Sequence, residues 1–351
     1  MVKRKPLKEV YKWLLPQHPL PLPEIIPHNP ISWFFFAYSY IIWSIEINTA
    51  CIKLHNGLFL VEDPTDIKSL WHDGFFGKGI FSRSESTWYE RTQKRLGLGI
   101  FKNLTREEIT ALRRDERKKF KKERAILEAK QAELKKKGIV DPFLKETLDL
   151  KTLRDKDLDT NTKRETFIRK EDEFLVENGI LKNIEYAELQ PVEVFFLKFA
   201  LNCVSISTPT CEDLSAESLL DILSNGLASD PFILNYVIYH YYRSSGWCVR
   251  SGIKFGTDYI LYKRGPPFSH AEYAVLLVPQ FKDQANDGPN FVELSGLNRI
   301  VGAVRKKLVL TFVEIPSQEE FDKARNIKDL LELYNIREFL YRRWVPNKNR
   351  D

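Results

Sequence analysis

Short apolar runs, bounded by Gly, Pro and polar residues, recur through the last third of the chain. They cover residues 247–252, 257–264, 272–278 and 307–315, and a final run covers residues 337–346. Runs of this length that are rich in β-branched and aromatic residues are typical of strands. The pattern therefore predicts five strands in this part of the chain.

Helix signals lie before and between these predicted strands. Residues 215–226 form an apolar and acidic stretch that ends at a glycine. Residues 229–246 contain Asp230 and Pro231, which is the usual pairing of an N-cap residue with proline in the first turn. A third helix is predicted from about Ser295, and it should run directly into the fourth predicted strand.

Composition divides the chain into three regions. Residues 1–104 are rich in Trp, Phe and Pro, which predicts a small aromatic-rich α/β region. Residues 105–185 are highly charged, and Thr105 with Glu108 forms a capping box that predicts a long charged helix followed by a linker. Residues 186–351 combine helices with mixed strands, which predicts a compact α+β domain.

The basic charge is concentrated in the predicted charged helix, residues 105–137. The whole chain has a formal net charge of +6, and residues 106–137 contain 13 Lys and Arg against 7 Asp and Glu. That segment alone accounts for the excess. Two interpretations stay open, namely a solvated helix and an arm that contacts RNA phosphate or a partner chain.

Several functional classes are disfavoured by what the sequence lacks. The basic N-terminus has no apolar segment of the signal-peptide kind behind it. The uncharged stretch of residues 31–45 and the stretch of residues 194–206 are shorter than the roughly 20 residues of a membrane span. Both are predicted to be buried core helices, with peripheral membrane contact left open. The four cysteines form no C-x-x-C pair, so neither a disulfide framework nor a metal site or cofactor is expected.

Two residues with acid–base chemistry flank a predicted turn. Alternation places Tyr262 with Ile260 on one face of its strand and Tyr259 on the other face. The following Gly-Pro-Pro-Phe turn reverses the chain, so His270 should return near the strand that carries Tyr262. Tyr262 and His270 are therefore candidates for a base and an acid.

A lysine at the junction of the third helix and the fourth strand completes the set. Arg299 and Lys306 lie seven residues apart, about two helical turns, and are predicted on the same side. A tyrosine, a histidine and a lysine that converge without an acidic metal cluster point to metal-free cleavage of a phosphodiester. The H-x-E motif that begins at His270 lacks the P-C-x-x-C of zinc deaminases, and no P-loop motif is present.

Three motifs carry a resemblance to a known family. The segments RSGIKFGTDYILYKRGPPFSHAEYAV, RIVGAVRKKLVLTFVE and YRRWVP, which lie within residues 247–346, resemble the tRNA-splicing endonuclease family. They look most like the fungal catalytic subunit that cuts at the 5′ splice site, and LPLPEIIPHNPISW resembles its N-terminus. The resemblance implies a mixed-sheet nuclease domain of the tRNA-intron endonuclease type, with Tyr262, His270 and Lys306 as catalytic residues.

The resemblance also implies a mechanism. Tyr262 would remove the proton of the 2′-hydroxyl, and because a tyrosine has a pKa near 10, the site must lower that pKa or transfer the proton late, with help from a neighbouring lysine. His270 would protonate the leaving 5′ oxygen, which suits the usual histidine pKa of about 6.5. Lys306 would neutralise charge on the phosphate, and the products would be a 2′,3′-cyclic phosphate and a 5′-hydroxyl.

RNA contacts and partners follow from the same resemblance. Archaeal relatives clamp a bulged base between two arginines. Arg299 matches the first arginine, and near the second position the chain offers Arg342, Arg343 and Trp344, of which Arg343 and Trp344 are the predicted RNA-binding pair. The expected partners are intron-containing pre-tRNA and, in a heterotetramer, a second catalytic subunit and two structural subunits.

Two alternative functions remain at this stage. The chain resembles, less closely, the sister subunit that cuts the 3′ splice site, and a non-catalytic RNA-scaffolding subunit would lack the complete set of three residues. Two locations are compatible with the resemblance, the nucleus and the cytosolic face of the mitochondrial outer membrane. The sequence leaves open which pre-tRNAs are cut.

Overall fold

The computed structural model describes residues 7–17, 22–45, 49–96, 114, 118, 174–177, 180–209, 213–281 and 288–342. The chain forms two compact units, one from Met1–Val10 and Lys78–Ala187, and a larger one from Tyr11–Gly77 and Glu188–Asp351. The larger unit carries every candidate catalytic residue. The predicted charged helix lies outside the described residues apart from two positions, and the predicted domain boundaries stay predictions.

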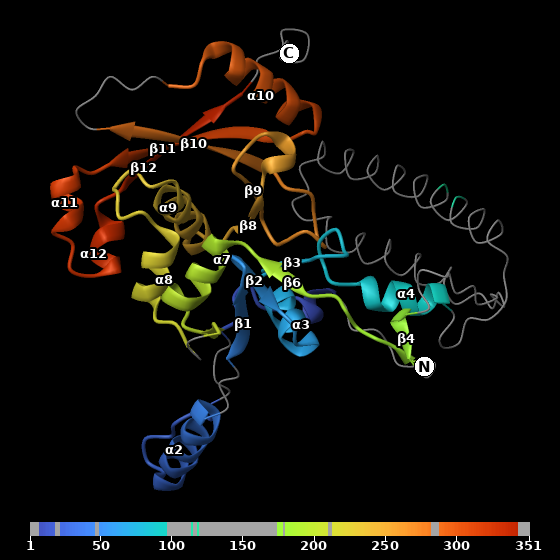
Figure 1. Cartoon of the computed structure of the whole chain (residues 1–351). Coiled ribbons are helices and arrows are strands. Elements are labelled where there is room, and N and C mark those ends of the chain that lie inside the picture. The colour runs from blue at the N-terminus through green and yellow to red at the C-terminus, as the bar shows by residue number, and fades with distance from the viewer. Residues whose placement is uncertain are drawn as a thin grey trace, which may run out of the picture. The chain divides into compact units, whose positions relative to one another are not determined.

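A five-stranded sheet forms the centre of the C-terminal part of the larger unit (Figure 1). Its order is β12–β11–β10–β9–β8, and only the β10–β11 pair is parallel. The strands are β8 (Cys248–Ser251), β9 (Tyr259–Tyr262), β10 (Tyr273–Phe281), β11 (Lys307–Ile315) and β12 (Asn335–Tyr341). A mixed sheet with helices confirms the predicted α+β class.

Two helices cover opposite faces of this sheet. Helix α10 (Phe291–Ala303) connects the parallel strands, and its Val301 packs in one cluster with Ile260 and Leu310. Helix α9 (Pro231–Ser244) lies against the alternate positions, since the hydroxyl of Tyr242 shares a hydrogen bond of 2.8 Å with that of Thr311. The alternation of a strand thus divides its side chains between α10 and α9.

A second sheet contains the N-terminal strands of the larger unit. Its order includes β6–β2–β1–β7, where β1 and β2 form an antiparallel hairpin and β1 pairs in parallel with β7. The hairpin turns at Asn56 and Gly57, both of which have positive φ, as a tight two-residue turn requires. These strands are β1 (Ala50–His55), β2 (Leu58–Val61), β6 (Ala187–Leu189) and β7 (Val204–Ser207).

The remaining elements are, with the exception of α2, short. In the larger unit they are α2 (Pro30–Ile45), α3 (Pro64–His72), α7 (Pro191–Phe195), the π-helix η2 (Phe196–Ala200), α8 (Ala216–Leu223), the 3-10 helix η3 (Ile253–Phe255), α11 (Gln318–Asp322) and α12 (Ile327–Glu332). In the smaller unit they are α1 (Leu7–Val10), β3 (Lys78–Gly79), α4 (Trp88–Leu96), β4 (Val176–Glu177) and β5 (Ile180–Leu181).

The two apolar stretches differ from their predictions. Residues 31–45 are helical, but the prediction of burial is wrong, since Trp33 is 55% and Phe34 71% exposed. Apolar side chains project from all sides of α2, a pattern that is typical of a covered helix, but the described part of the chain does not cover it. Residues 194–206 are mostly buried but not one helix, because the chain leaves η2 at Asn202, with φ of +47°, and enters β7. Within the described residues, no helix combines the length and apolarity needed to cross a bilayer.

Candidate active site at the edge of the C-terminal sheet

Three strands present their ends at one edge of the C-terminal sheet. β9 ends there at Tyr262, whereas β10 and β11 begin there at Tyr273 and Lys307. β10 lies between the other two strands, antiparallel to β9 and parallel to β11. The connections that leave this edge therefore lie close together although they are far apart in the sequence.

The backbone of Glu272 ties the three segments together. Its N–H donates to the carbonyl of Leu261, and its carbonyl accepts from the N–H of Lys307, each at 3.0 Å. Leu261 is followed by Tyr262 at the end of β9, and Lys307 is preceded by Lys306. Tyr262 and Lys306 thus lie on either side of the segment that leads into β10.

His270 stands on that central segment, two residues before Glu272. Its side chain is exposed, while the next residue, Ala271, is buried in the core cluster that includes Val301. On its other side, the N–H of Ser269 donates to the carbonyl of Gly265 at 3.4 Å. The exposed imidazole is therefore carried by a backbone that is fixed before and after it.

Tyr262 and Lys306 share the face of the sheet that α10 covers. The side chain of Tyr262 packs against the core cluster beneath α10, and so does that of Phe255. The ammonium of Lys306 lies 5.1 Å from the centre of the Phe255 ring. Lys307 lies instead over Tyr273, at 5.5 Å. Only the first of the two adjacent lysines therefore faces the side where Tyr262 lies.

Tyr259, the competing candidate for the base, has a structural role. It is buried, and its hydroxyl donates a hydrogen bond of 3.2 Å to the carbonyl of Asn235 on α9. Burial raises the pKa of Tyr259 well above its ordinary value. The predicted alternation is confirmed here, because Tyr259 and Tyr262 project to different faces of β9.

The pKa of Tyr262 bears on the two options that the sequence left open, a lowered pKa or a late proton transfer. Burial raises the pKa of Tyr262, the nearby Cys248 adds to the rise, and Arg250 opposes it. Lys306 is not among the groups that shift this pKa in the unbound chain. Burial lowers the pKa of Lys306 itself. At neutral pH the free site therefore holds a protonated Tyr262.

Lys306 owes its place to the way α10 ends. The helix stops at Ala303, and Arg305 takes the left-handed conformation with φ of +58°. The N–H of Lys306 then donates to the carbonyl of Val301 at 3.0 Å, which is the wrapped ending known as a Schellman motif. The prediction that Arg299 and Lys306 share one side of a helix is wrong, because the helix ends before Lys306.

The predicted RNA-binding residues are described only in part. Arg299 lies exposed on α10. Strand β12 pairs antiparallel with β11 and brings Tyr341 beside Leu308, so the exposed Arg342 follows at the same edge as Lys306. Arg343 and Trp344 lie outside the described residues. The structure thus places one member of the alternative trio, Arg342, at the candidate site's edge of the sheet.

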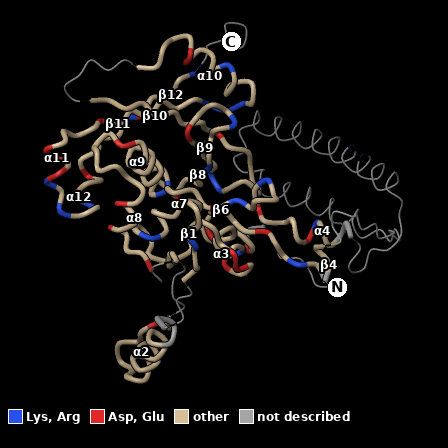
Figure 2. Tube along the Cα trace, in the orientation of Figure 1, with Lys and Arg blue, Asp and Glu red and all other residues tan. Residues whose placement is uncertain are grey.

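Basic side chains surround the edge. Figure 2 shows Lys and Arg in blue along the segments near β9 and α10. The exposed basic residues of these segments are Lys254, Lys263, Arg264, Arg299, Arg305 and Lys307. The exposed Glu272 is an acidic residue of the same region. A rim of this kind attracts a polyanion such as a nucleic acid backbone.

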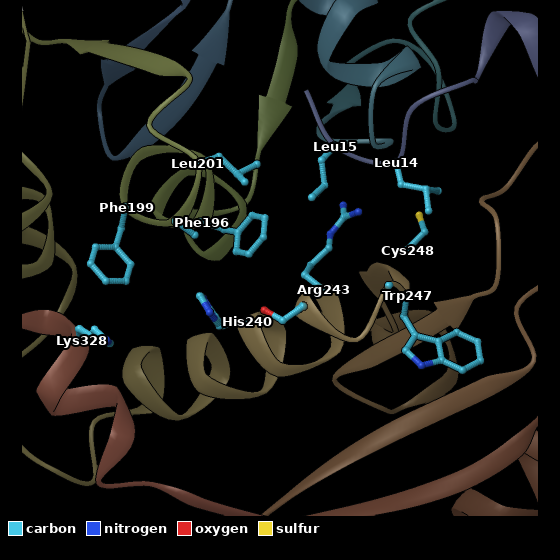
Figure 3. Close-up of a pocket in the computed structure, with 13 residues that line it drawn as sticks. Leu14, Leu15, Phe196, Phe199, Leu201, His240, Arg243, Trp247, Cys248 and Lys328 are labelled. Carbon is cyan, nitrogen blue, oxygen red and sulfur yellow. The ribbon is translucent and has the colours of Figure 1, made fainter. Parts of the chain in front are cut away.

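A cavity of about 580 Å³ lies elsewhere in the larger unit (Figure 3). Its lining is mainly apolar and includes Leu14, Phe196 and Trp247, together with His240 and Arg243. None of Tyr262, His270 and Lys306 lines it, although the lining residue Cys248 pairs with Tyr262 between β8 and β9. Among the described residues, no group of three or more His, Cys, Asp or Glu side chains is placed to hold a metal ion.

Comparisons with known proteins identify the family. The family description "tRNA intron endonuclease, catalytic C-terminal domain" matches residues 232–322. Over 100% of both chains, the sequence is 40% identical to tRNA-splicing endonuclease subunit SEN2 of Saccharomyces cerevisiae and 37% identical to that of Eremothecium gossypii. It is 34% identical to the probable subunit sen2 of Schizosaccharomyces pombe, over 98% of this chain and 99% of the relative. The predicted resemblance is confirmed: the chain belongs to the tRNA-splicing endonuclease family.

Proposed function

We propose that this chain is the subunit of a tRNA-splicing endonuclease that cuts intron-containing pre-tRNA at the 5′ splice site. The observation that carries the proposal is the convergence of Tyr262, His270 and Lys306 on one basic edge of the C-terminal sheet. All three lie within the residues that match the catalytic domain of the family. The full-length similarity to SEN2 subunits supports the assignment to this subunit type.

The proposed reaction is an internal transfer at the phosphodiester. The 2′-oxygen of the RNA attacks its neighbouring phosphorus while Tyr262 accepts the 2′-hydroxyl proton. The bond from phosphorus to the 5′ oxygen breaks, and His270 gives that oxygen a proton. Lys306 neutralises charge on the pentacoordinate phosphate. The products are a 2′,3′-cyclic phosphate and a 5′-hydroxyl, and the step needs neither a metal ion nor water.

The raised pKa of Tyr262 constrains how this reaction proceeds. A protonated tyrosine cannot take up a second proton, so at neutral pH the reaction proceeds through the small fraction of sites in which Tyr262 is deprotonated. Lys306 has a lowered pKa because its side chain is partly buried. A bound phosphate should stabilise the charged form of Lys306, because a nearby anion favours an ammonium that is partly removed from water.

Partners and location complete the proposal. The other members of the complex would be a second catalytic subunit and two structural subunits in a heterotetramer, with β11 and β12 at the interface. Arg299, Arg343 and Trp344 would contact unpaired RNA bases by stacking. The complex would work in the nucleus or on the cytosolic face of the mitochondrial outer membrane, in peripheral contact with it.

The two adjacent lysines provide a test with an internal control. In the assembled endonuclease, Lys306→Ala should slow cleavage at the 5′ junction by about 10²-fold, because a positioned charge at the developing anion is lost. Lys307→Ala removes the same charge one residue away and should change the rate less than about threefold. The measurement is cleavage of end-labelled pre-tRNA in EDTA, with both junctions and the chemistry of the new ends read separately.

The outcomes separate the alternatives. Slow cutting confined to the 5′ junction, with a cyclic phosphate on the product, supports the proposal. Slow cutting confined to the 3′ junction would show that the chain is the sister subunit. Equal effects of the two lysine substitutions at the 5′ junction would remove Lys306 from the proposed mechanism.

A further inference from the structure

Gly265, near the start of the loop that carries His270, rests directly on the ring of Phe75. A Cβ added at Gly265 would overlap three carbon atoms of that ring, and the φ of Gly265 is +124°. Contact and backbone conformation therefore both require glycine. The loop of residues 263–270, the histidine loop, is thus seated on a side chain that lies almost 200 residues earlier in the sequence.

A second ring supports the same loop. Phe268 meets Tyr11 edge to face, with ring centres 5.9 Å apart, and Tyr11 lies 5.2 Å from Phe75. The N–H of Phe268 also donates to the carbonyl of Gly265 at 3.2 Å, which closes the turn between the two contact points. Tyr11 and Phe75 together form an aromatic seat for the histidine loop.

The seat is itself held in place by buried polar groups. Phe75 is fully buried with φ of +62°, a conformation that costs an L-residue free energy. Its N–H donates to the carbonyl of Trp71 at 3.0 Å, and its carbonyl accepts from the guanidinium of Arg250 at 2.5 Å. Arg250 also donates to the carbonyl of Gly77 at 2.7 Å.

The segment around Phe75 has further buried partners. Glu193 pairs with Arg250 at 3.0 Å and accepts from the N–H of Gly77 at 3.2 Å. Arg243 donates to the carbonyl of Gly74 at 2.9 Å, and its guanidinium lies 4.2 Å from the centre of the Phe76 ring. Two arginines and a glutamate thus fix the backbone of residues 74–77. The strained Phe75 persists because its surroundings determine its position.

We infer that Tyr11 and Phe75 are positioning residues that set where His270 stands relative to Tyr262 and Lys306. The inference rests on the proposed function, because it gives the seat a role in delivering the leaving-group proton. The histidine loop ends at His270 and therefore determines where the backbone of this residue lies. Ala271 anchors one side of the histidine in the core, and the aromatic seat anchors the other.

Two substitutions lift the loop from its seat without touching His270. Gly265→Ala introduces the methyl group that overlaps Phe75, and Phe268→Ala removes the ring that meets Tyr11. A misplacement of about 1 Å in a catalytic group costs up to about 10²-fold in rate. We expect Gly265→Ala to lower the single-turnover rate of 5′ cleavage by roughly 30- to 100-fold and Phe268→Ala by about 10-fold, with substrate binding unchanged.

The matched control for Gly265→Ala is Gly226→Ala. Gly226 also has positive φ, +72°, but nothing lies within 4 Å of an added Cβ. It therefore places a β-carbon at a positive φ without the overlap, although +72° lies near the left-handed region, which strains an alanine less than +124° does. Tyr11→Phe retains the ring that meets Phe268 and should preserve activity, whereas Tyr11→Ala should lower the rate about as much as Phe268→Ala. The double variant Tyr11→Ala/Phe268→Ala should be no slower than Tyr11→Ala alone, because the contact between the two rings is already lost in that single variant.

A modified substrate distinguishes positioning of the acid from general damage. A pre-tRNA with sulfur in place of the bridging 5′ oxygen at the 5′ junction releases a thiolate, which needs no proton because thiols have a pKa near 8.5. On this substrate, assembled enzymes with His270→Ala, Gly265→Ala or Phe268→Ala should all cut within about threefold of the wild-type rate. Thermal unfolding of each variant confirms its fold, and Phe268→Ala carries the test if Gly265→Ala does not assemble.

The outcomes separate this inference from the function it rests on. Rescue of both His270→Ala and the loop variants by the sulfur substrate supports the inference. Rescue of His270→Ala alone, with the loop variants slow on both substrates, overturns the inference and leaves the proposed function in place. If His270→Ala cuts both substrates at the wild-type rate, or cuts both slowly, His270 is not the general acid. The catalytic assignment of His270 and the positioning role of Tyr11 and Phe75 would then both be wrong.

Discussion

Replacing Tyr262 with phenylalanine should lower 5′ cleavage by about 10²–10⁴-fold, the usual contribution of a general base, while the enzyme remains folded. The substitution removes only the hydroxyl, and the ring keeps its packing against the core cluster beneath α10. The measurement is the single-turnover rate at the 5′ junction in the assembled endonuclease. Thermal unfolding should show a change within about 1 kcal/mol.

Tyr259 is the matched control on the same strand. Tyr259→Phe removes a hydroxyl that donates to the carbonyl of Asn235, so it should cost about 1 kcal/mol of stability and leave the cleavage rate within about threefold. The reverse pattern, with a slow Tyr259→Phe enzyme and an active Tyr262→Phe enzyme, would show that Tyr259, on the other face of β9, is the general base.

The rate of 5′ cleavage should depend on pH, because only the deprotonated form of Tyr262 can accept the 2′-hydroxyl proton. Burial raises the pKa of Tyr262, so this form is scarce near neutral pH and becomes more abundant as the pH rises. In the His270→Ala variant on the sulfur substrate, no acid titrates against it. The rate should therefore increase about tenfold per unit between about pH 6 and about pH 8. A rate that is level across this interval would mean that Tyr262 does not act as the base.

Replacing Arg250 with methionine should produce the largest loss of stability. The substitution leaves Glu193 buried without its ion pair, and removal of one partner of a buried pair costs about 3–5 kcal/mol. The side chains of Arg250 and Glu193 are only 15% and 3% exposed, so water cannot replace the lost contact. The melting temperature should fall by about 5–10 °C.

Two further variants check this explanation. Lys328→Met breaks the exposed pair with Glu332, whose side chains are 80% and 68% exposed, and should cost less than about 0.5 kcal/mol. Adding Glu193→Gln to Arg250→Met removes the unpaired charge and should recover part of the loss. An Arg250→Met protein as stable as Lys328→Met would show that the buried pair does not hold the segment around Phe75.

Local signals explain which elements the sequence predicted well. The strand β11 has the predicted bounds, and α9 begins after Asp230, whose carboxylate accepts from the N–H of Phe232 at 2.7 Å. Gly246 follows the end of α9 with positive φ, as predicted, whereas α8 ends at Leu223, three residues before the predicted Gly226. These features depend on residues adjacent in the chain, so their chemistry is readable without the fold.

Other features depend on residues that lack a local signature. Asn290 caps α10, which begins four residues before the predicted start at Ser295, and the end of the helix depends on a left-handed Arg305 rather than on a glycine. The exposure of α2 contradicts a prediction made from apolarity alone. A hydrophobic composition indicates that the side chains of a segment favour burial, but it does not indicate whether the same chain provides the residues that bury them.

The candidate site was only partly readable from the sequence. Alternation indicated the face that Tyr262 occupies, and the family resemblance selected Lys306 over Lys307. The convergence itself arises from the parallel register of β10 with β11, which brings Glu272 beside both flanking segments. The support from Phe75 and Arg250 was missed, because contacts across about 175 residues leave no pattern that a single sequence reveals.

The most direct measurement compares His270→Ala with wild type in the assembled endonuclease. An intron-containing pre-tRNA is cut in the presence of EDTA, and the 5′ and 3′ junctions are read separately. We expect the variant to leave the 5′ junction uncut and to cut the 3′ junction at close to the wild-type rate. Normal cutting at the 5′ junction would show instead that His270 has no catalytic role.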